Sequence, residues 1–186
     1  MALAELKAIP EIHSRRLRLE GLRPEHAAPL HAGVFSREKV MHYTTLMPFE
    51  SLEHTAEFID EQLRGFRERR SVHWLASEKN GDDLVGIVSL HDINLRHERA
   101  ELGYVLTESA WGKGHASEIV ASLLRFGFHT LGLARIEAEV AWGNEASIRV
   151  LEKNGLRKEG VRQARYRKGD TFRDATVFGM LAPRLR

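Results

Sequence analysis

The sequence predicts a mixed α/β fold, with a twisted central sheet of about seven strands flanked by helices, and three observations support it. Some short segments, such as residues 135–142, alternate apolar and polar residues, which is typical of half-buried strands. Others, such as residues 119–131, carry apolar residues at helical spacing. The two kinds of segment follow one another along the chain. The predicted order is strand, two helices, three strands, helix, strand, helix and two strands.

The chain of 186 residues is expected to form one domain, residues 1–186, because this length suits a single hydrophobic core. Residues 1–14 are expected to be a flexible N-terminal extension. The first strand follows, where Leu17 and Leu19 alternate with charged residues, so that one face is predicted to be buried.

Two helices are predicted next. Pro24 suits the first turn of a helix, and apolar residues continue at helical spacing as far as Phe35. Ser51 is a suitable N-cap for the second helix. We expect this helix to end near residues 67–70, where four residues include three arginines, because cations favour a helix C-terminus.

Three strands then occupy the middle of the chain. Residues 71–77 and 84–90 flank an Asn-Gly pair at 80–81, which is a strong hairpin signal. Residues 91–99 are polar and are expected to be a loop. Residues 100–106 form the next strand, in which a glycine at 103 indicates a bulge or a splayed edge.

The C-terminal part alternates helices and strands again. Residues 144–155 form a compact helix, with Asn144 as its N-cap and Gly155 as its stop signal. The tail has two strand-like segments, 160–168 and 171–181, which are joined by a Gly-Asp turn. Together with the strand at 135–142, these elements complete the predicted sheet.

Composition excludes several classes of protein. The formal charge is only +2, so no global field favours nucleic acid. Cysteine is absent, which excludes disulfides, thiolate metal sites and a cysteine thioester mechanism. No apolar run approaches the roughly 20 residues that cross a bilayer, and no secretory signal is visible at the N-terminus. We therefore expect a cytoplasmic protein without a membrane partner.

The ten histidines do not predict a metal site. None forms an H-x-x-x-H or H-E-x-x-H motif. The pairs His26/His31 and His91/His97 are poorly spaced for one helical face. Two basic clusters, residues 67–70 and 162–168, are interpreted as solvated surface.

The segment WGKGHAS, residues 111–117, is the candidate binding loop. It precedes a predicted helix, whose N-terminus offers unpaired N–H groups and partial positive charge. Gly112 and Gly114 would let this backbone approach a phosphate closely, and Lys113 adds a cation. The segment is no Walker loop, and the dinucleotide fingerprint is incomplete because Ser117 replaces its third glycine.

Two longer segments, ELGYVLTESAWGKGHASEIV and IEAEVAWGNEASIRVLEKNGL, resemble the GNAT N-acetyltransferase family. The likeness is closest to the branch that acetylates the N-terminal alanine or serine of ribosomal proteins. The family signature [Q/R]-x-x-G-x-[G/A] reads Trp111 to Ala116 here, with Trp111 in place of Gln or Arg. The family's N-x-x-S and L-E-K-x-G-F patterns also match, with Leu156 in place of Phe.

The resemblance implies a GNAT-like fold whose sheet splays between its fourth and fifth strands. It implies acetyl-CoA as co-substrate, with its pantetheine and diphosphate held by the splayed strand and the following helix. No metal is implied. The residues expected to bind the cofactor are Val105, Leu106, Trp111, Gly112, Lys113, Gly114, His115, Ala116, Ser117, Asn144, Ser147 and Lys153.

The resemblance also implies catalytic residues. Ser147 is expected near the coenzyme A sulfur, as the acid; its simpler interpretation is a serine in the first turn of a helix. Glu101 is expected as the base, on the strand facing the splay, and its alternative is a surface glutamate. The backbone N–H near Val105 is expected to bind the carbonyl oxygen. His91 and Tyr166 are further candidates for contact with the acceptor.

The predicted function is acetyl transfer from acetyl-CoA to a primary amine, most readily the N-terminal α-amine of a ribosomal or other protein. Alternatives are acetylation of a polyamine or aminoglycoside, a non-catalytic coenzyme A-binding module, and a nucleic-acid-binding domain, which the low charge disfavours. Residues 37–54 are expected to select the acceptor. The chain is predicted to be a monomer or a homodimer.

Overall fold

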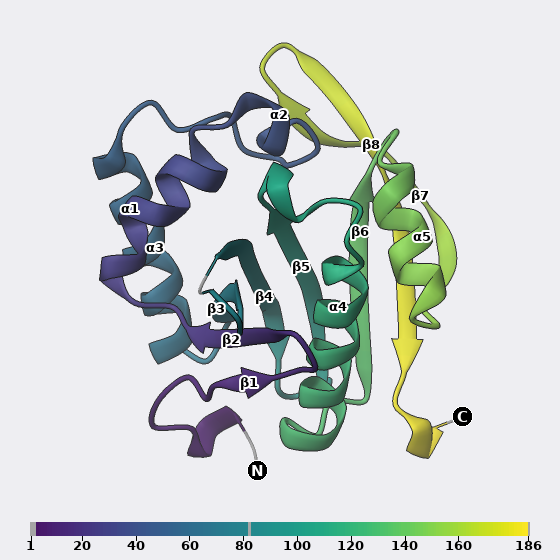
Figure 1. The fold of residues 1–186 in the computed structure, drawn as a ribbon. Coiled ribbons are helices and arrows are strands. Elements are labelled where there is room, and N and C mark those ends of the chain that lie inside the picture. The colour runs from purple at the N-terminus through teal and green to yellow at the C-terminus, as the bar shows by residue number, and fades with distance from the viewer. Residues whose placement is uncertain (1–2, 82, 186) are drawn as a thin grey trace.

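An eight-stranded mixed sheet forms the centre of the computed structural model, which describes residues 3–81 and 83–185 (Figure 1). The strands are β1 (Ile12–His13), β2 (Leu17–Gly21), β3 (Val72–Glu78), β4 (Leu84–Asn94), β5 (Arg99–Leu106), β6 (Arg135–Ala141), β7 (Arg157–Lys168) and β8 (Thr171–Leu181). Their spatial order is β1-β2-β3-β4-β5-β6-β8-β7. The predicted mixed sheet is confirmed, and β1 is a strand that the sequence did not predict.

Helices cover both faces of the sheet, and each layer has its own core (Figure 1). The helices are α1 (Ala27–Leu30), α2 (Glu38–Met41), α3 (Leu52–Arg67), α4 (His115–Arg125) and α5 (Glu145–Lys153). On one face, Leu30 and Ile59 of α1 and α3 pack with Ile87 of β4. On the other face, Ile119 and Leu123 of α4 belong to the larger core. Each helix thus buries its apolar stripe against the sheet, and this burial stabilises the helix.

The sheet parts between β5 and β6. All pairs of neighbouring strands are antiparallel except β5 and β6, which are parallel and pair only over Arg99–Glu101 with Arg135–Glu137. Beyond Glu101, β5 keeps its pairing with β4 alone. The splay expected between the fourth and fifth predicted strands is therefore confirmed. It opens at the level of Glu101.

The predicted loop at residues 91–99 is mostly strand, which corrects the sequence analysis. β4 continues through residue 94, and His91 lies directly opposite Glu101 of β5. Asp92 has a positive φ of 48° at the irregularity that follows. The polar composition of this stretch misled the prediction, because a strand that borders a cavity needs no apolar alternation.

The helix predicted after Pro24 is also divided. It comprises a 3₁₀ turn, the short α1 and a π-helical segment over His31–Phe35. The hydroxyl of Ser36 donates a hydrogen bond to the carbonyl of His31, which helps to end the segment. α2 follows and was not predicted. The N-cap predictions are confirmed, since Ser51 and Asn144 each accept a hydrogen bond from a backbone N–H three residues later.

The N-terminal segment is packed against the domain and is no free extension, as far as residues 3–14 are described. Leu3 and Leu6 are buried in the larger core. Arg69 donates hydrogen bonds to both of their carbonyls, at 2.9 and 2.8 Å. The indole of Trp74 donates to the carbonyl of Pro10 at 2.8 Å. These hydrogen bonds join residues more than 60 positions apart, so no local pattern in the sequence revealed this packing.

A carboxylate of α4 connects the same segment to the rest of the fold. Glu118 accepts hydrogen bonds from the Ser14 hydroxyl at 2.7 Å and from the backbone N–H of Arg16 at 2.6 Å. The Arg16 guanidinium is paired with it at 2.8 Å. Burial alone would raise the pKa of Glu118, but these bonds lower it to about 2. The charge on Glu118 therefore stabilises the folded state.

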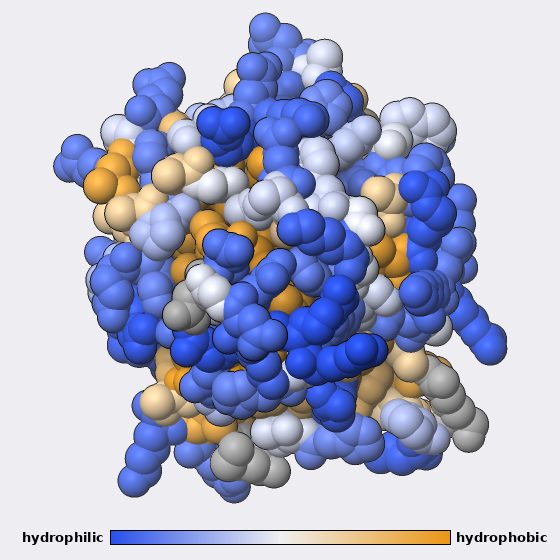
Figure 2. All heavy atoms as spheres, in the orientation of Figure 1, coloured by the Kyte–Doolittle hydropathy of each residue, from blue (hydrophilic) through white to orange (hydrophobic). Residues whose placement is uncertain are grey.

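The surface in view is mostly hydrophilic, with hydrophobic residues visible in small areas (Figure 2). Among the described residues, no helix combines the length and the hydropathy that crossing a bilayer demands.

We predict that Glu118→Gln lowers the free energy of unfolding by about 1–3 kcal/mol at neutral pH, because it replaces charged hydrogen bonds. The pKa of Glu118 falls on folding, so its stabilisation is complete above about pH 4.5 and is lost as the pH falls towards 2. Urea denaturation should show that the difference in free energy of unfolding between wild type and variant is smaller at pH 3.5 than at pH 7. Glu57→Gln, at an exposed position of α3, is the control. An equal gap at both pH values would contradict this assignment.

Candidate active site

The glycine loop before α4 has the backbone geometry that its sequence suggested. Gly112 and Gly114 have positive φ angles of 72° and 79°, which glycine adopts at little cost. Gly114 is the N-cap of α4, and no side chain caps the helix there. The carbonyl of Lys113 accepts a hydrogen bond from Arg16 at 2.9 Å. The loop thus leaves N–H groups of α4 available, while Arg16, just before β2, fixes its position.

A groove of about 430 Å³ runs along this loop between α4 and α5. Of the twelve residues predicted to bind the cofactor, all but Lys113 line it. The side chain of Lys113 points elsewhere, with its Nζ 4.0 Å from a carboxylate oxygen of Glu78, and it lines a separate pocket. Arg149 also lines the groove and adds a cation beside Lys153.

Two aromatic side chains border the groove. Trp111 is 44% exposed, and its indole N–H donates to the carbonyl of Leu106 at 3.0 Å. His115 is buried, with its Nε2 3.6 Å from Glu78. Burial, followed by the charge of Arg16, lowers the pKa of His115. Its imidazole is therefore neutral near pH 7 and adds no positive charge to that of the helix terminus.

The start of α5 faces β5 across the splay. Asn144 caps the helix by accepting from the Ser147 N–H at 3.1 Å. The Ser147 hydroxyl shares a hydrogen bond of 2.7 Å with the phenol of Tyr104. Burial raises the pKa of Tyr104, so the phenol keeps its proton. Tyr104 was not proposed as a site residue; its contact with Ser147 joins residues 43 positions apart, which no local pattern reveals.

A second cavity, of about 330 Å³, lies at the opening of the sheet. Six predicted residues meet there, although they come from four different elements or their ends: Glu101, Val105, His91, Tyr166, Asn144 and Ser147. We call this cavity the acceptor pocket. It shares Tyr104, Val105, Asn144 and Ser147 with the groove, so the two cavities are continuous along β5 and α5.

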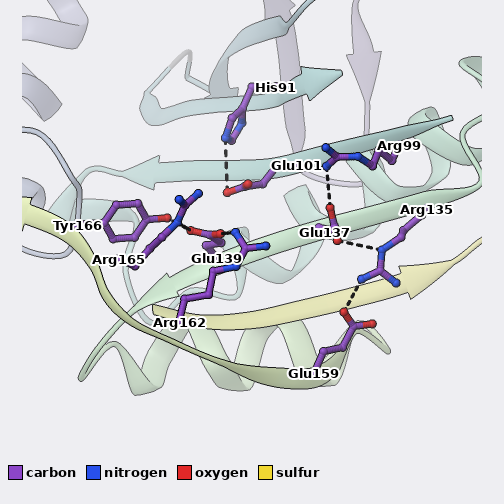
Figure 3. A network of polar contacts seen from close by, with 10 residues as sticks. All are labelled: His91, Arg99, Glu101, Arg135, Glu137, Glu139, Glu159, Arg162, Arg165 and Tyr166. Carbon is purple, nitrogen blue, oxygen red and sulfur yellow. Dashed lines mark hydrogen bonds and ion pairs between the residues drawn. The ribbon is translucent and has the colours of Figure 1, made fainter. Parts of the chain in front are cut away.

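Glu101 and His91 lie side by side in this pocket (Figure 3). The Nε2 of His91 is 3.6 Å from a carboxylate oxygen of Glu101. The Nδ1 of His91 is 3.1 Å from the hydroxyl of Ser89, which orients the ring. On the neighbouring strand β3, burial and then the charge of His91 lower the pKa of His73 to about 3. A neutral His73 therefore adds no charge to the pair.

A buried carboxylate on β6 organises the opposite wall (Figure 3). The side chain of Glu139 is only 3% exposed. It is contacted by Arg162, Arg165 and the phenol of Tyr166. Burial alone would raise the pKa of Glu139, but hydrogen bonds from Arg165 and Tyr166 lower it. Glu139 therefore stays ionised and fixes the direction of Tyr166, whose own pKa is raised by burial and by Glu139.

A further carboxylate on the same face is paired with arginines. Glu137 lies beside Glu101 in the register of β5 and β6. It accepts hydrogen bonds from Arg99 at 3.1 Å and from Arg135 at 3.0 Å. Its charge is therefore compensated within the protein.

The structure also groups three side chains that could share a metal ion. Ligand atoms of His91, Asp92 and Glu101 lie within 4.8 Å of one another. Sequence analysis missed this group because the three residues meet only through the pairing of β4 with β5. The prediction that the protein needs no metal remains a prediction.

Comparison with known proteins identifies the family. The model of the acetyltransferase (GNAT) domain matches residues 16–157. The chain belongs to the GNAT acetyltransferase family. It is similar to an uncharacterised N-acetyltransferase, YoaA, of Bacillus subtilis, with 35% identity over 94% of this chain and 98% of that protein. GNAT acetyltransferases use acetyl-CoA, and the protein is accordingly an acetyl-CoA-dependent N-acetyltransferase.

Two other GNAT proteins are named for different acceptors. Spermidine N(1)-acetyltransferase of Escherichia coli is 30% identical over 82% of this chain and 77% of its own length. The structure of RimL, a ribosomal L7/L12 α-N-protein acetyltransferase in complex with coenzyme A, superposes with a TM-score of 0.84. It is 21% identical, over 95% of this chain and 98% of that one, so this likeness is one of fold.

We predict that Glu139→Ala destabilises the protein by about 1–3 kcal/mol, because two arginines and a phenol lose a buried partner. The estimate is below that for a fully buried pair, since both arginines are about half exposed. Thermal and urea unfolding measure the loss. Glu159→Ala, whose carboxylate contacts Arg135 at a more exposed position, is the control and should cost less. Equal losses for both would refute a special role for Glu139.

Proposed function

We propose that this protein transfers the acetyl group of acetyl-CoA to the α-amine of a protein N-terminus, with ribosomal proteins as the first acceptors to test. One observation carries the proposal: the groove beside the glycine loop and the acceptor pocket meet at Tyr104 and Ser147. A carboxylate, Glu101, stands in the pocket at the point where the sheet opens.

The groove suits a ligand with a diphosphate. Unpaired N–H groups at the start of α4 would bind the phosphate oxygens, helped by the helix dipole. Both glycines of the loop have left-handed backbone angles, and Arg149 and Lys153 add positive charge. Acetyl-CoA, once bound there, supplies an acetyl group already activated as a thioester. Holding two reactants in line can lower a barrier by about 7–11 kcal/mol.

Glu101 is proposed as the general base, directly or through water. An α-amine has a pKa near 8, against about 10.4 for a lysine-type amine, so a weak base suffices for it. His91 keeps the Glu101 carboxylate in place and offers a second proton acceptor beside it. On the opposite side, Ser147 is proposed to supply a proton to the leaving sulfur. The hydrogen bond to Tyr104 orients the Ser147 hydroxyl for that role.

The charges around the pocket favour an acceptor with a single amine. Glu137 and Glu139 are each compensated by two arginines. Within the described residues, Glu101 and Asp92 are the pocket-lining carboxylates without an arginine or lysine partner. A polyamine carries several ammonium groups and would need more such carboxylates. Because one relative is a spermidine N(1)-acetyltransferase, spermidine is the competing acceptor to test.

A mass-based acetylation assay tests the proposal. Acetyl-CoA is combined with peptides that begin with Ala or Ser, with the same peptides blocked at the N-terminus, and with spermidine. We expect acetylation of the free peptides and none of the blocked ones. Faster turnover of spermidine than of every peptide would replace the proposed acceptor with a polyamine.

We predict that Glu101→Gln lowers kcat about 10²–10⁴-fold, the usual contribution of one proton-transfer group. The affinity for coenzyme A, measured by calorimetry, should stay unchanged because Glu101 does not line the groove. Glu57→Gln serves as the control at an exposed glutamate. A variant with wild-type kcat would exclude Glu101 as the base.

We predict that Gly112→Val weakens coenzyme A binding about ten-fold or more. A Cβ at this position meets no atom within 4 Å, but the φ of 72° strains any branched residue. Gly132→Val is a matched control, since Gly132 has a φ of 71° and equally open surroundings but does not line the groove. Calorimetric titration with coenzyme A measures both variants. If both variants lost affinity for coenzyme A equally, the loss would reflect backbone strain in general, and this result would contradict binding at this loop.

A further inference from the structure

The walls of the acceptor pocket come from segments far apart in the sequence. One wall is the segment of residues 41–46, which starts at the last residue of α2 and which we call the acceptor loop. Its residues Tyr43, Thr44 and Thr45 line the pocket. Another wall is the hairpin of β7 and β8, which contributes Arg165 and Tyr166. Figure 1 shows the tip of this hairpin reaching over to α2. A direct connection exists between these two walls.

That connection is the side chain of Lys168, at the end of β7. Its ammonium Nζ donates to the carbonyl oxygens of Met41 at 2.5 Å, Thr44 at 3.1 Å and His42 at 3.2 Å. An ammonium group has three N–H donors. All three donors of Lys168 therefore find a carbonyl acceptor on one short stretch of backbone. Burial, followed by the charge of Arg173, lowers the pKa of Lys168, as expected of an ammonium group directed towards the protein.

Both partners of this contact are held in place by other bonds. The carbonyl of Lys168 accepts a hydrogen bond from the Thr171 hydroxyl at 3.1 Å, across the hairpin tip. Nearer the sheet, the N–H of Ala164, in a bulge with a φ of 48°, donates to Asp174 at 2.8 Å. In the acceptor loop, the Thr44 hydroxyl contacts the Met41 carbonyl at 2.8 Å. The lysine therefore joins two local structures that already have defined shapes.

We propose that Lys168 is a positioning residue that fixes the acceptor loop against the hairpin and thereby sets the affinity for the amine substrate. The inference rests on the proposed function in one respect, since it takes this pocket as the acceptor site. The bonds go to backbone carbonyls, so the sequence of the loop can vary while its position is kept. The loop would then present Tyr43 and Thr44 to the acceptor in one arrangement.

Lys168→Met tests this role, because methionine keeps an unbranched apolar stem but cannot donate. Hydrogen–deuterium exchange of the free protein should become at least five-fold faster at amides within residues 41–46. The KM for the acceptor should rise about ten-fold, which corresponds to about 1.4 kcal/mol, while kcat changes less than two-fold. Lys168→Arg, which keeps the donors, should recover much of the acceptor affinity.

Lys158→Met is the matched control, at an exposed lysine of the same strand, and should change neither exchange nor KM. Unchanged exchange and unchanged acceptor KM in Lys168→Met would overturn the proposal. Lys168→Gln is the second variant if the methionine variant unfolds, and it should give the same changes to a smaller degree. The exchange measurement needs no substrate, so failure of the proposed α-amine activity and failure of the Lys168 role are distinguishable.

Discussion

The early parting of β5 and β6 is the constraint on which the rest of the site depends. The two parallel strands share only three residue pairs, and beyond them the backbone of β5 has no strand partner on that side. Polar backbone groups in such a position need another partner, which water or a ligand must supply. The opening therefore gives a substrate access to main-chain groups in the middle of the sheet. Both cavities lie along it.

Charge compensation limits what the opening can bind. β5 and β6 direct a row of carboxylates to one face, with Glu101 and Glu137 in register and Glu139 two residues further on. Arginines from β5 and β7 neutralise the second and third of these, respectively. This leaves Glu101, beside His91, without an arginine partner, which is why we propose it as the proton acceptor. Because Arg162 and Arg165 belong to β7, their pairing with Glu139 also holds the β7–β8 hairpin to β6, so electrostatics and the shape of the pocket are coupled.

Much of the sheet and of the cofactor groove followed from local sequence signals. Alternation at residues 135–141, the glycines of the loop and the Asn144 cap each depend on neighbouring residues only, and sequence expresses such features directly. The pairing of His91 with Glu101, the Tyr104–Ser147 bond and the contact of Lys168 with the acceptor loop join segments 10 to 127 residues apart. No single-sequence pattern encodes such distances.

The packing of the N-terminal segment escaped the sequence analysis for the same reason, because Ser14 and Arg16, between β1 and β2, contact Glu118 of α4 more than 100 residues later. Arg16 connects Glu118 to the carbonyl of Lys113, and therefore connects the turn between β1 and β2 with the glycine loop. Thermodynamic linkage makes such a connection reciprocal. A ligand that orders the loop must also tighten the attachment of the chain's first strands, and whatever loosens those strands must weaken the ligand by the same factor.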